Sequence, residues 1–326
     1  MKFRKIILVI ALIAIIGIGI ALAVVNKKSI GEKNNNKIQV VASNFASYDF
    51  LKQIIGDSDN INLTFLLGPG KDAHSYDPTA QDIITIQNAD LFVYVGGGME
   101  KWAPKVLESL DTSKEKVICI SDDVQKKDEV EIDGAEPEED DDDADVVGGA
   151  FDEHIWTSPA NAISMVNALE NAMEELDSSN ISKYKLNANN YINEIKDVDS
   201  QIQTVVNNKK RDRLVFGDKM PMQYFMDYYK LNVSAAFSGC STETEPSSKT
   251  IAYLVDTVKK DNIPAVLYIE LGVGKVANTI AAEAGNGCKA LQIQTLHNVS
   301  KEDFDNGETW VSLMKRNIDV LKVALD

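Results

Sequence analysis

From about residue 38 onward, short apolar runs alternate with segments of helical periodicity, and no other feature constrains the fold as strongly. Runs such as Ile38–Ser43, Leu91–Val95 and Ala265–Ile269 are short and rich in aliphatic residues, which predicts strands. Strands that alternate with helices form parallel sheets whose faces the helices cover. The sequence therefore predicts an α/β protein.

The other elements follow from the same patterns. We expect further strands at 61–67, 117–120, 214–216, 233–237 and 290–293, and helices at 48–55, 77–88, 101–110, 222–229, 247–258, 276–284 and 310–325. The second of these helices begins at Asp77-Pro78, with the proline in the first turn, where its missing N–H costs least. From Pro159 to Val206 the chain is helical apart from a break at Ser178-Ser179. The second half, of about 25 residues, spans roughly 37 Å and can join two lobes.

These patterns predict two lobes, each a mostly parallel β-sheet flanked by helices, joined by one long rigid linker helix. We expect an anchor and tether at 1–36, an amino-terminal lobe at 37–180, the linker helix at 181–209 and a carboxyl-terminal lobe at 210–326. The length of 326 residues agrees with two domains of roughly 150 residues each.

The amino terminus indicates export. Basic residues in Met1–Lys5 precede an uncharged apolar run from Ile6 to Val25, about 20 residues long and so near the length that crosses a bilayer. Positive charge on its amino side predicts that the rest lies outside the cytoplasm. Ala21–Ala23 offers a cleavage site, so both a membrane-anchored and a secreted protein stay open. No cysteine lies near this run, so a lipid anchor is not expected.

Charge is distributed unevenly along the chain. The 33 basic and 50 acidic residues give a net charge of −17, which argues against nucleic acid as a partner. Asp128–Asp145 holds twelve of the acids and no base, and we expect a disordered, solvated acidic loop at about 122–150. This loop is either an insertion without a function or a device that attracts divalent cations.

Two histidines stand in loops that precede predicted helices. His74 lies in the loop 68–78 and His154 in the segment 151–159. Open α/β sheets bind ligands at the carboxyl ends of their strands, where such loops can converge on one cleft. Imidazole is the commonest nitrogen ligand for zinc. Each histidine taken alone could equally be an exposed loop residue, but their shared setting favours a metal site.

The segments around these histidines resemble the metal-binding proteins of zinc and manganese ABC importers. The resemblance extends over roughly residues 38–326 and rests on Gly70–Pro78, Ala89–Gly96, Met99–Trp102, Asp152–Trp156, Ser158–Asn161, Glu245–Ser247, Val299–Phe304 and Trp310–Asn317. It implies two α/β lobes with a metal between them, His74 and His154 as the first two ligands, and no enzymatic activity. It also implies an ABC permease and its ATPase as partners, and we expect a monomer. Zinc-selective members often carry an acidic or histidine-rich loop where Asp128–Asp145 stands here.

The second lobe departs from the family pattern. The place of a third histidine, after the first strand of that lobe, reads Val215–Pro221, with Asp218 as the nearest donor. The last strand–helix loop carries Gln294, with His297 three residues on. Phe237–Glu245 adds one thiol and two carboxylates. Our order of candidates for the second lobe is Glu243, His297, Asp218 and Cys240, each of which could instead cap a helix or face solvent.

The donor set restricts the metal. Two imidazoles with one or two carboxylates suit Zn²⁺ or Mn²⁺, and a third imidazole would favour zinc. Together with this donor set, the resemblance implies an extracytoplasmic receptor that captures Zn²⁺ in the cleft between the lobes and delivers it to an importer. The alternatives are a manganese or iron receptor of the same class, a surface zinc hydrolase, and an adhesin-type protein with a vestigial site.

Overall fold

The computed structural model describes residues 37–326 apart from 112, 114, 133, 136–150 and 239–244. The apolar run Ile6–Val25, most of the acidic run, Cys240 and Glu243 lie outside these residues. Gln39–Asp326, which includes both lobes, forms one compact unit. In the part of the chain that the structure describes, no helix is both long enough and apolar enough to span a membrane.

Two parallel four-stranded sheets form the centre of the fold, as predicted. The amino-terminal sheet has the order β2-β1-β3-β4 and consists of β1 (Ile38–Ala42), β2 (Ile61–Phe65), β3 (Leu91–Tyr94) and β4 (Lys116–Cys119). The carboxyl-terminal sheet has the order β6-β5-β7-β8 and consists of β5 (Arg213–Phe216), β6 (Asn232–Ala235), β7 (Ala265–Ile269) and β8 (Lys289–Ile293). The two sheets have the same strand order. In each lobe, the loops at the carboxyl ends of the strands therefore lie at the edge where such sheets bind ligands.

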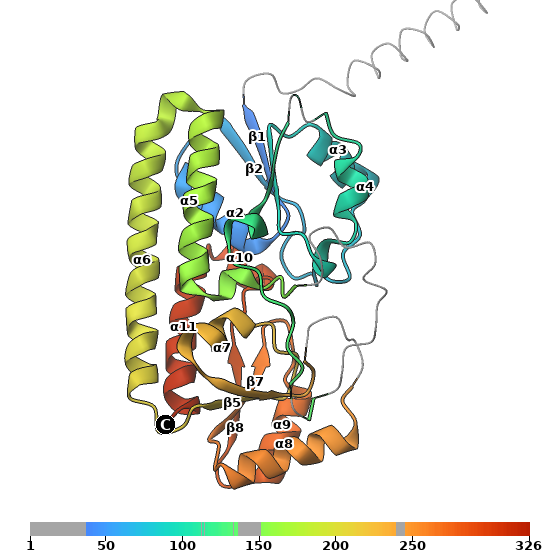
Figure 1. Cartoon of the computed structure of the whole chain (residues 1–326), viewed down its shortest axis with the longest axis vertical. Coiled ribbons are helices and arrows are strands. Elements are labelled where there is room, and N and C mark those ends of the chain that lie inside the picture. Colours follow the sequence, from blue (N-terminus) through green and yellow to red (C-terminus); the bar gives the residue numbers. More distant parts are fainter. Residues whose placement is uncertain (1–36, 112, 114, 133, 136–150, 239–244) are drawn as a thin grey trace, which may run out of the picture. The chain divides into compact units, whose positions relative to one another are not determined.

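Helices connect the strands and cover the sheets (Figure 1). The α-helices are α2 (Phe45–Ile55), α3 (Ala80–Gln87), α4 (Ala103–Leu107), α5 (Pro159–Leu176), α6 (Ile181–Asn207), α7 (Gln223–Tyr229), α8 (Ser248–Lys260), α9 (Lys275–Ala284), α10 (Lys301–Asp305) and α11 (Trp310–Ala324). Short 3₁₀ turns are η1 (Gly98–Glu100), η2 (Ile120–Asp123), η4 (Ile155–Thr157) and η5 (Ser178–Asn180). The division into lobes at 37–180 and 210–326 stays a prediction.

The long helix α6 has 27 residues, so it extends over about 40 Å. Its buried side chains recur every three or four residues and therefore share one face: Tyr184, Ala188, Tyr191, Ile195, Val198 and Ile202. Through this face α6 packs against α2, α5 and α11, which lie beside it in Figure 1. The predicted long helix thus holds elements from both halves of the chain.

Asp49 ties three of these helices together. Asp49 lies on α2. Its Oδ2 accepts hydrogen bonds from the Tyr191 hydroxyl of α6 (2.5 Å) and from the backbone N–H of Trp310 at the start of α11 (2.8 Å). Burial raises the pKa of Asp49, and these hydrogen bonds act in the opposite direction. Removing the carboxylate would leave buried donors without their acceptor.

One local expectation was wrong, and one short helix was not expected. Pro78 does not stand in the first turn of α3, because the helix begins at Ala80. Thr79 caps it in a reciprocal arrangement: Asp82 N–H donates to Thr79 Oγ1, and Thr79 N–H donates to Asp82 Oδ2. This capping box satisfies two end groups and sets the helix start two residues later. The short helix α10, capped by Ser300, was not predicted.

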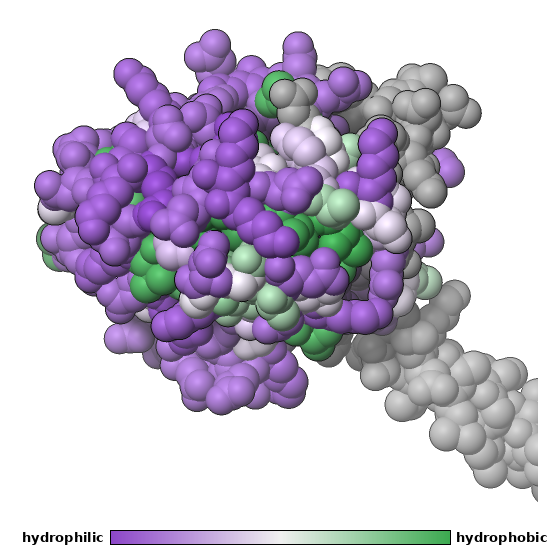
Figure 2. Space-filling view, turned by 90° about the horizontal axis from the view of Figure 1, so that it is seen from below, coloured by the Kyte–Doolittle hydropathy of each residue, from purple (hydrophilic) through white to green (hydrophobic). Residues whose placement is uncertain are grey.

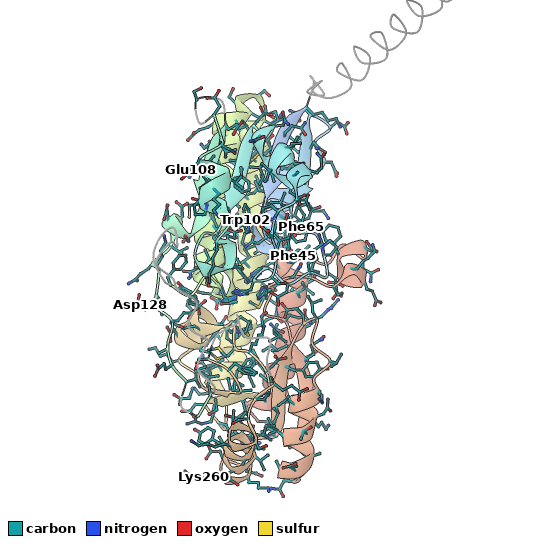
Figure 3. The ribbon with its side chains drawn as sticks, turned by 90° about the vertical axis from the view of Figure 1, so that its right-hand side faces the viewer. Phe45, Phe65, Trp102, Glu108, Asp128 and Lys260 are labelled. Atoms are coloured by element: carbon teal, nitrogen blue, oxygen red, sulfur yellow. The ribbon has the colours of Figure 1, made fainter. Side chains whose placement is uncertain are left out.

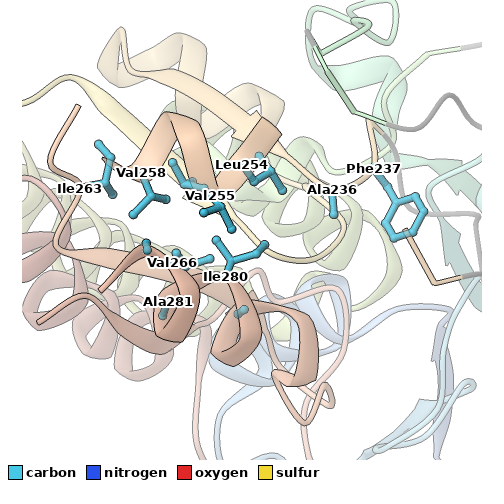
Figure 4. Packing of buried hydrophobic residues seen from close by; sticks show 12 residues of the cluster. Ala236, Phe237, Leu254, Val255, Val258, Ile263, Val266, Ile280 and Ala281 are labelled. Carbon is cyan, nitrogen blue, oxygen red and sulfur yellow. The ribbon is translucent and has the colours of Figure 1, made fainter. Parts of the chain in front are cut away.

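Each lobe has its own hydrophobic core. In the amino-terminal lobe, Phe45 and Phe65 lie with ring centroids 6.2 Å apart (Figure 3). In the carboxyl-terminal lobe, side chains of α8 and α9 meet over β7, with Leu254 and Val266 fully buried (Figure 4).

The face seen from below in Figure 1 is mainly hydrophilic, with a hydrophobic area near its middle (Figure 2). This is the pattern of sheets covered by amphipathic helices.

The first part of the stretch expected to be a solvated loop contacts the carboxyl-terminal lobe. Lys127 N–H donates to the Tyr224 hydroxyl (3.0 Å), and Ile132 N–H donates to Ser238 Oγ (3.0 Å). The carbonyl of Lys127 accepts from Asp152 N–H (2.9 Å), close to the second histidine loop. Asp128, labelled in Figure 3, is exposed. The described residues of this stretch therefore differ from a freely solvated loop, because their backbone is hydrogen bonded.

The core analysis predicts the effect of one truncation. Leu254→Ala should lower the free energy of unfolding by about 2–5 kcal/mol, because Leu254 is fully buried and a cavity would remain. Leu186→Ala is the matched control, since Leu186 on α6 is 61% exposed and its loss should change stability by less than about 0.5 kcal/mol. Urea denaturation measures both, and equal effects would contradict the assigned core.

Candidate metal centre

His74 lies in the loop between β2 and α3, and local hydrogen bonds fix its backbone. Its N–H donates to Asp72 Oδ1 at 2.8 Å, and Tyr76 N–H donates to the carbonyl of Ala73 at 3.3 Å. The side chain is partly buried. Its Nε2 atom is itself buried and has no hydrogen-bond partner among the described residues. A buried ring nitrogen of this kind can accept a metal ion.

His154 immediately precedes the 3₁₀ turn η4 and is buried. Asp152 Oδ1 accepts both its backbone N–H (2.8 Å) and its ring Nδ1–H (2.9 Å). A carboxylate at Nδ1 fixes the ring orientation and leaves the lone pair on Nε2. This carboxylate–histidine pair is the arrangement that orients metal-binding imidazoles in proteins.

His297 follows β8 in the carboxyl-terminal lobe and is also buried. The buried carboxylate of Glu270, just after β7, accepts from His297 N–H at 2.9 Å and from Thr295 N–H at 2.7 Å. Leu296 between them adopts a positive φ of 59°. Such a backbone is costly for a residue with a side chain, so Glu270 holds the loop in a defined conformation.

The three rings meet at one point. The ring centroids are 5.8 Å apart for His74 and His154, 5.0 Å for His74 and His297, and 5.3 Å for His154 and His297. One nitrogen from each ring lies within 4.8 Å of the others. The sequence contains three histidines, so every imidazole of the chain belongs to this cluster. The described residues therefore contain a group that could hold a metal ion.

Burial keeps the rings of His74 and His297 neutral. The pKa of His297 is lowered to about 3, mainly by burial and then by the charge of His154, with Lys219 acting in the same direction and Asp72 opposing it. The pKa of His74 is also lowered well below its usual value by burial and by the neighbouring histidines. A neutral imidazole presents a lone pair, so no proton must leave His74 or His297 before a metal binds at neutral pH.

Bonds between the lobes hold the histidine loops against each other. The Asn298 side chain donates to the carbonyls of Gly68 (3.1 Å) and Lys71, and Gly70 N–H donates to the carbonyl of Val299 (2.8 Å). These contacts join the loop of His74 to the loop of His297.

The loop of His154 is connected in the same way. Trp156 Nε1–H donates to the carbonyl of Thr295 (3.0 Å), and Trp310 Nε1–H donates to the carbonyl of Trp156 (2.9 Å). All three histidine positions are thereby coupled.

The other sequence candidates fall elsewhere. Asp218 is not part of the histidine group; its two oxygens accept the backbone N–H groups of Lys219 (2.9 Å) and Ile269 (3.4 Å). Burial raises its pKa. Glu243 and Cys240 lie outside the described residues. Of the four candidates from the second lobe, the described structure brings only His297 to the two amino-lobe histidines.

Sequence reasoning missed Glu270. It directly follows the strand predicted at 265–269, at the edge where parallel strands collect ligand-binding side chains. Its position after a predicted strand could therefore have identified Glu270 as a candidate for the site.

A second buried acid, Glu100, accepts from Val95 N–H and Gly96 N–H at 2.7 Å each. Burial raises the pKa of Glu100 to about 7.

Comparison with known proteins identifies similar chains. The family model described as zinc-uptake complex component A, periplasmic, matches residues 40–324. The zinc-binding lipoprotein AdcA of Streptococcus pneumoniae (strain ATCC BAA-255 / R6) is 32% identical over 294 residues, which cover 90% of this chain and 56% of that protein. This chain thus spans about half of that relative's length. The high-affinity zinc uptake system protein ZnuA of Bacillus subtilis (strain 168) is 29% identical over 300 residues, with 91% of each chain covered.

A solved structure supports the same relationship. The crystal structure of the Zn(II)-bound ZnuA-like domain of Streptococcus pneumoniae AdcA matches with a TM-score of 0.72 and 30% sequence identity. The match covers 89% of this chain and 99% of that domain. The two-lobed fold is therefore shared over nearly the whole of the part described here.

The lowered histidine pKa predicts a pH-dependent stability. An unfolded histidine has a pKa of about 6.5, so between that value and about 3 the unfolded chain binds a proton that folded His297 does not. This contribution of His297 is present above about pH 6.5 and is lost as the pH falls. The part of the free-energy difference between the metal-free native protein and His297→Asn that comes from the titration of His297 itself should shrink by at most about 1.4 kcal/mol per pH unit.

Urea denaturation in the presence of a chelator, at several pH values from about 7 to about 5, measures this difference. Carboxylates titrate in both proteins and therefore cancel. A difference that does not change with pH would show that His297 is not held neutral by burial.

Proposed function

The chain belongs to the family of zinc-uptake complex component A proteins, and we propose that it captures Zn²⁺ outside the cytoplasm and delivers it to the permease of an ABC importer. The family consists of transport binding proteins, which agrees with the expectation that the chain is not an enzyme. The observation that carries the proposal is the meeting of all three histidines of the sequence in one buried cluster between the lobes.

His74, His154 and His297 are the proposed zinc ligands. Zinc prefers nitrogen and sulfur donors, and its bonds to nitrogen are about 2.0–2.1 Å long. Two donors of one tetrahedral zinc ion therefore lie roughly 3.3 Å apart. The three nitrogens lie within 4.8 Å of one another, so they need to approach by about 1.5 Å at most. Three imidazoles favour zinc over manganese, which prefers oxygen donors. Zn²⁺ is here the cargo, and manganese is the weaker alternative.

Capture and release follow from the origin of the ligands. His74 and His154 come from the amino-terminal lobe, and His297 comes from the carboxyl-terminal lobe. A small movement of the loop 294–300 relative to the amino-terminal lobe would remove one imidazole and weaken zinc binding. The bonds from Asn298 to Gly68 and Lys71 resist this movement. We assign the release step to the docked permease, which would have to separate these loops.

The location of the protein follows from the same proposal. One relative is named a zinc-binding lipoprotein. In this chain the uncharged run Ile6–Val25 would serve as membrane anchor or export signal, with the folded part outside the cytoplasm as a monomer. The partners are then the permease and, through it, the ATPase of an importer.

The acidic run Asp128–Asp145 would raise the concentration of cations near the cleft. Its first residues adjoin the His154 loop through the bond between Lys127 and Asp152. Carboxylates exposed near a binding site accelerate the association of cations, and salt screens this effect.

Zinc titration tests the ligand set. Isothermal titration calorimetry should show one tight site in the native protein, and this site should disappear in the double variant His74→Ala/His154→Ala because only one imidazole remains. Asn190→Ala is the control, since Asn190 is exposed on α6 and should leave the titration unchanged. Unaltered zinc affinity in the double variant would refute the ligand assignment.

The acidic run is tested by kinetics. Replacing Asp140–Asp143 with Asn removes four negative charges. The association rate of zinc should then fall at low ionic strength and approach the native rate at high salt, where exposed charges are screened within less than about 10 Å. Stopped-flow competition with a chromophoric chelator measures this rate. An equal rate at low salt would assign no steering role to these residues.

A further inference from the structure

Three imidazoles leave one position of a closed tetrahedral zinc shell unfilled. The described part of the second lobe supplies His297, while Asp218 is bound to backbone N–H groups. We propose that Asp72, from the same loop as His74, supplies the fourth ligand to the ion. This inference rests on the proposed zinc-binding function, because it completes the same site.

Distance favours Asp72. Its Oδ1 lies 3.8 Å from His297 Nε2 across the two lobes. Two donors that share a tetrahedral zinc ion at about 2.1 Å lie roughly 3.4 Å apart, so the observed separation is within about half an ångström of that geometry. His297 Nδ1 and Nε2 belong to a buried ring, whereas the Asp72 side chain is 44% exposed and can rotate toward the ion. Asp72 is near His297 but is not part of the group of donors that lie within 4.8 Å of one another, so its side chain has to rotate toward the other two rings to join them.

The loop already fixes Asp72 beside the cluster. Asp72 Oδ1 accepts the backbone N–H of His74 at 2.8 Å, so the carboxylate and the imidazole two residues later are held on one turn. A carboxylate has two oxygens and about four acceptor positions, so this bond leaves others for a metal. One short loop thereby offers two ligands, and displacing it would remove both at once.

Other nearby carboxylates have different tasks. Each is buried and accepts hydrogen bonds from backbone N–H groups: Glu100, Asp152, Glu153 and Glu270. The bonds of Asp152 and Glu153 hold the loop of His154, and those of Glu270 hold the loop of His297. The bonds of Glu100 hold the backbone that follows β3. Moving any of these oxygens to the ion would leave buried donors without an acceptor, which is costly. Asp72 can bind the ion at a smaller cost because it is partly exposed.

Charge balance points the same way. Zn²⁺ bound to three neutral imidazoles keeps its full charge of two, and the Lys219 ammonium acts electrostatically on both His74 and His297. A carboxylate in the fourth position offsets part of this positive charge, whereas a water molecule would not. Asp72 is the carboxylate whose charge acts on His297 against that of Lys219.

The test compares two variants of one loop. Asp72→Asn keeps an oxygen that can accept the His74 N–H but replaces the carboxylate with a poor ligand. Asp77→Asn is the matched control, because Asp77 is exposed in the same loop and loses the same charge. Zinc affinity by chelator competition should fall at least about tenfold more in Asp72→Asn than in the control, since even second-layer partners cost that much.

A spectroscopic measurement separates ligation from loop positioning. The visible absorption bands of bound Co²⁺ report its donors and geometry, so they should shift in Asp72→Asn and stay unchanged in Asp77→Asn. Equal affinities and identical Co²⁺ spectra in the two variants would overturn the role of Asp72. In that case the proposed function would still stand if His74→Ala/His154→Ala abolishes binding. Absence of zinc binding by the native protein would instead refute the proposed function itself.

Discussion

The burial of three imidazoles at one point is the constraint on which the rest of the structure depends. Burial lowers the pKa of His74 and of His297, and repulsion between protonated rings, whose centroids lie between 5.0 and 5.8 Å apart, acts in the same direction. Such a cluster costs free energy in the empty protein, because buried nitrogens lose their hydrogen bonds to water. A bound cation with imidazole affinity would recover this cost. The site is therefore arranged for a ligand and is poorly explained as core packing.

Buried carboxylates convert this constraint into defined geometry. Asp152 orients the ring of His154, and Glu270 holds the strained turn before His297. Because each carboxylate accepts N–H groups, its charge is partly compensated inside the fold. The bonds from Asn298 to the loop of His74 then bring ligands of both lobes together. Asp49 supports the same arrangement from the helices α2, α6 and α11. The helices thus hold the two lobes together, and the loops fix the positions of the histidine rings.

Sequence patterns predicted the periodic part of the molecule well and the site in part. The short apolar runs predicted the two parallel sheets, and the helical spacing predicted α6, because buried residues recur with the period of each element. The strand-to-helix position of His74 and His154 indicated a shared site. His297 was one candidate among four, since spacing along the chain does not reveal which loops of two lobes converge. Asp218, ranked next after His297, has its oxygens on backbone N–H groups. The start of α3 was misplaced because Thr79 and Asp82 form a cap more favourable than Pro78 offers.

The account is tested most directly by imidazole ¹⁵N NMR of the native protein during zinc titration. With three histidines in the sequence, six ring nitrogens report the whole cluster. The account predicts that one Zn²⁺ per chain shifts one nitrogen of every ring, with the Nδ1 of His154 remaining a donor to Asp152. Saturation with zinc while any one of the three rings keeps its metal-free nitrogen shifts would contradict it.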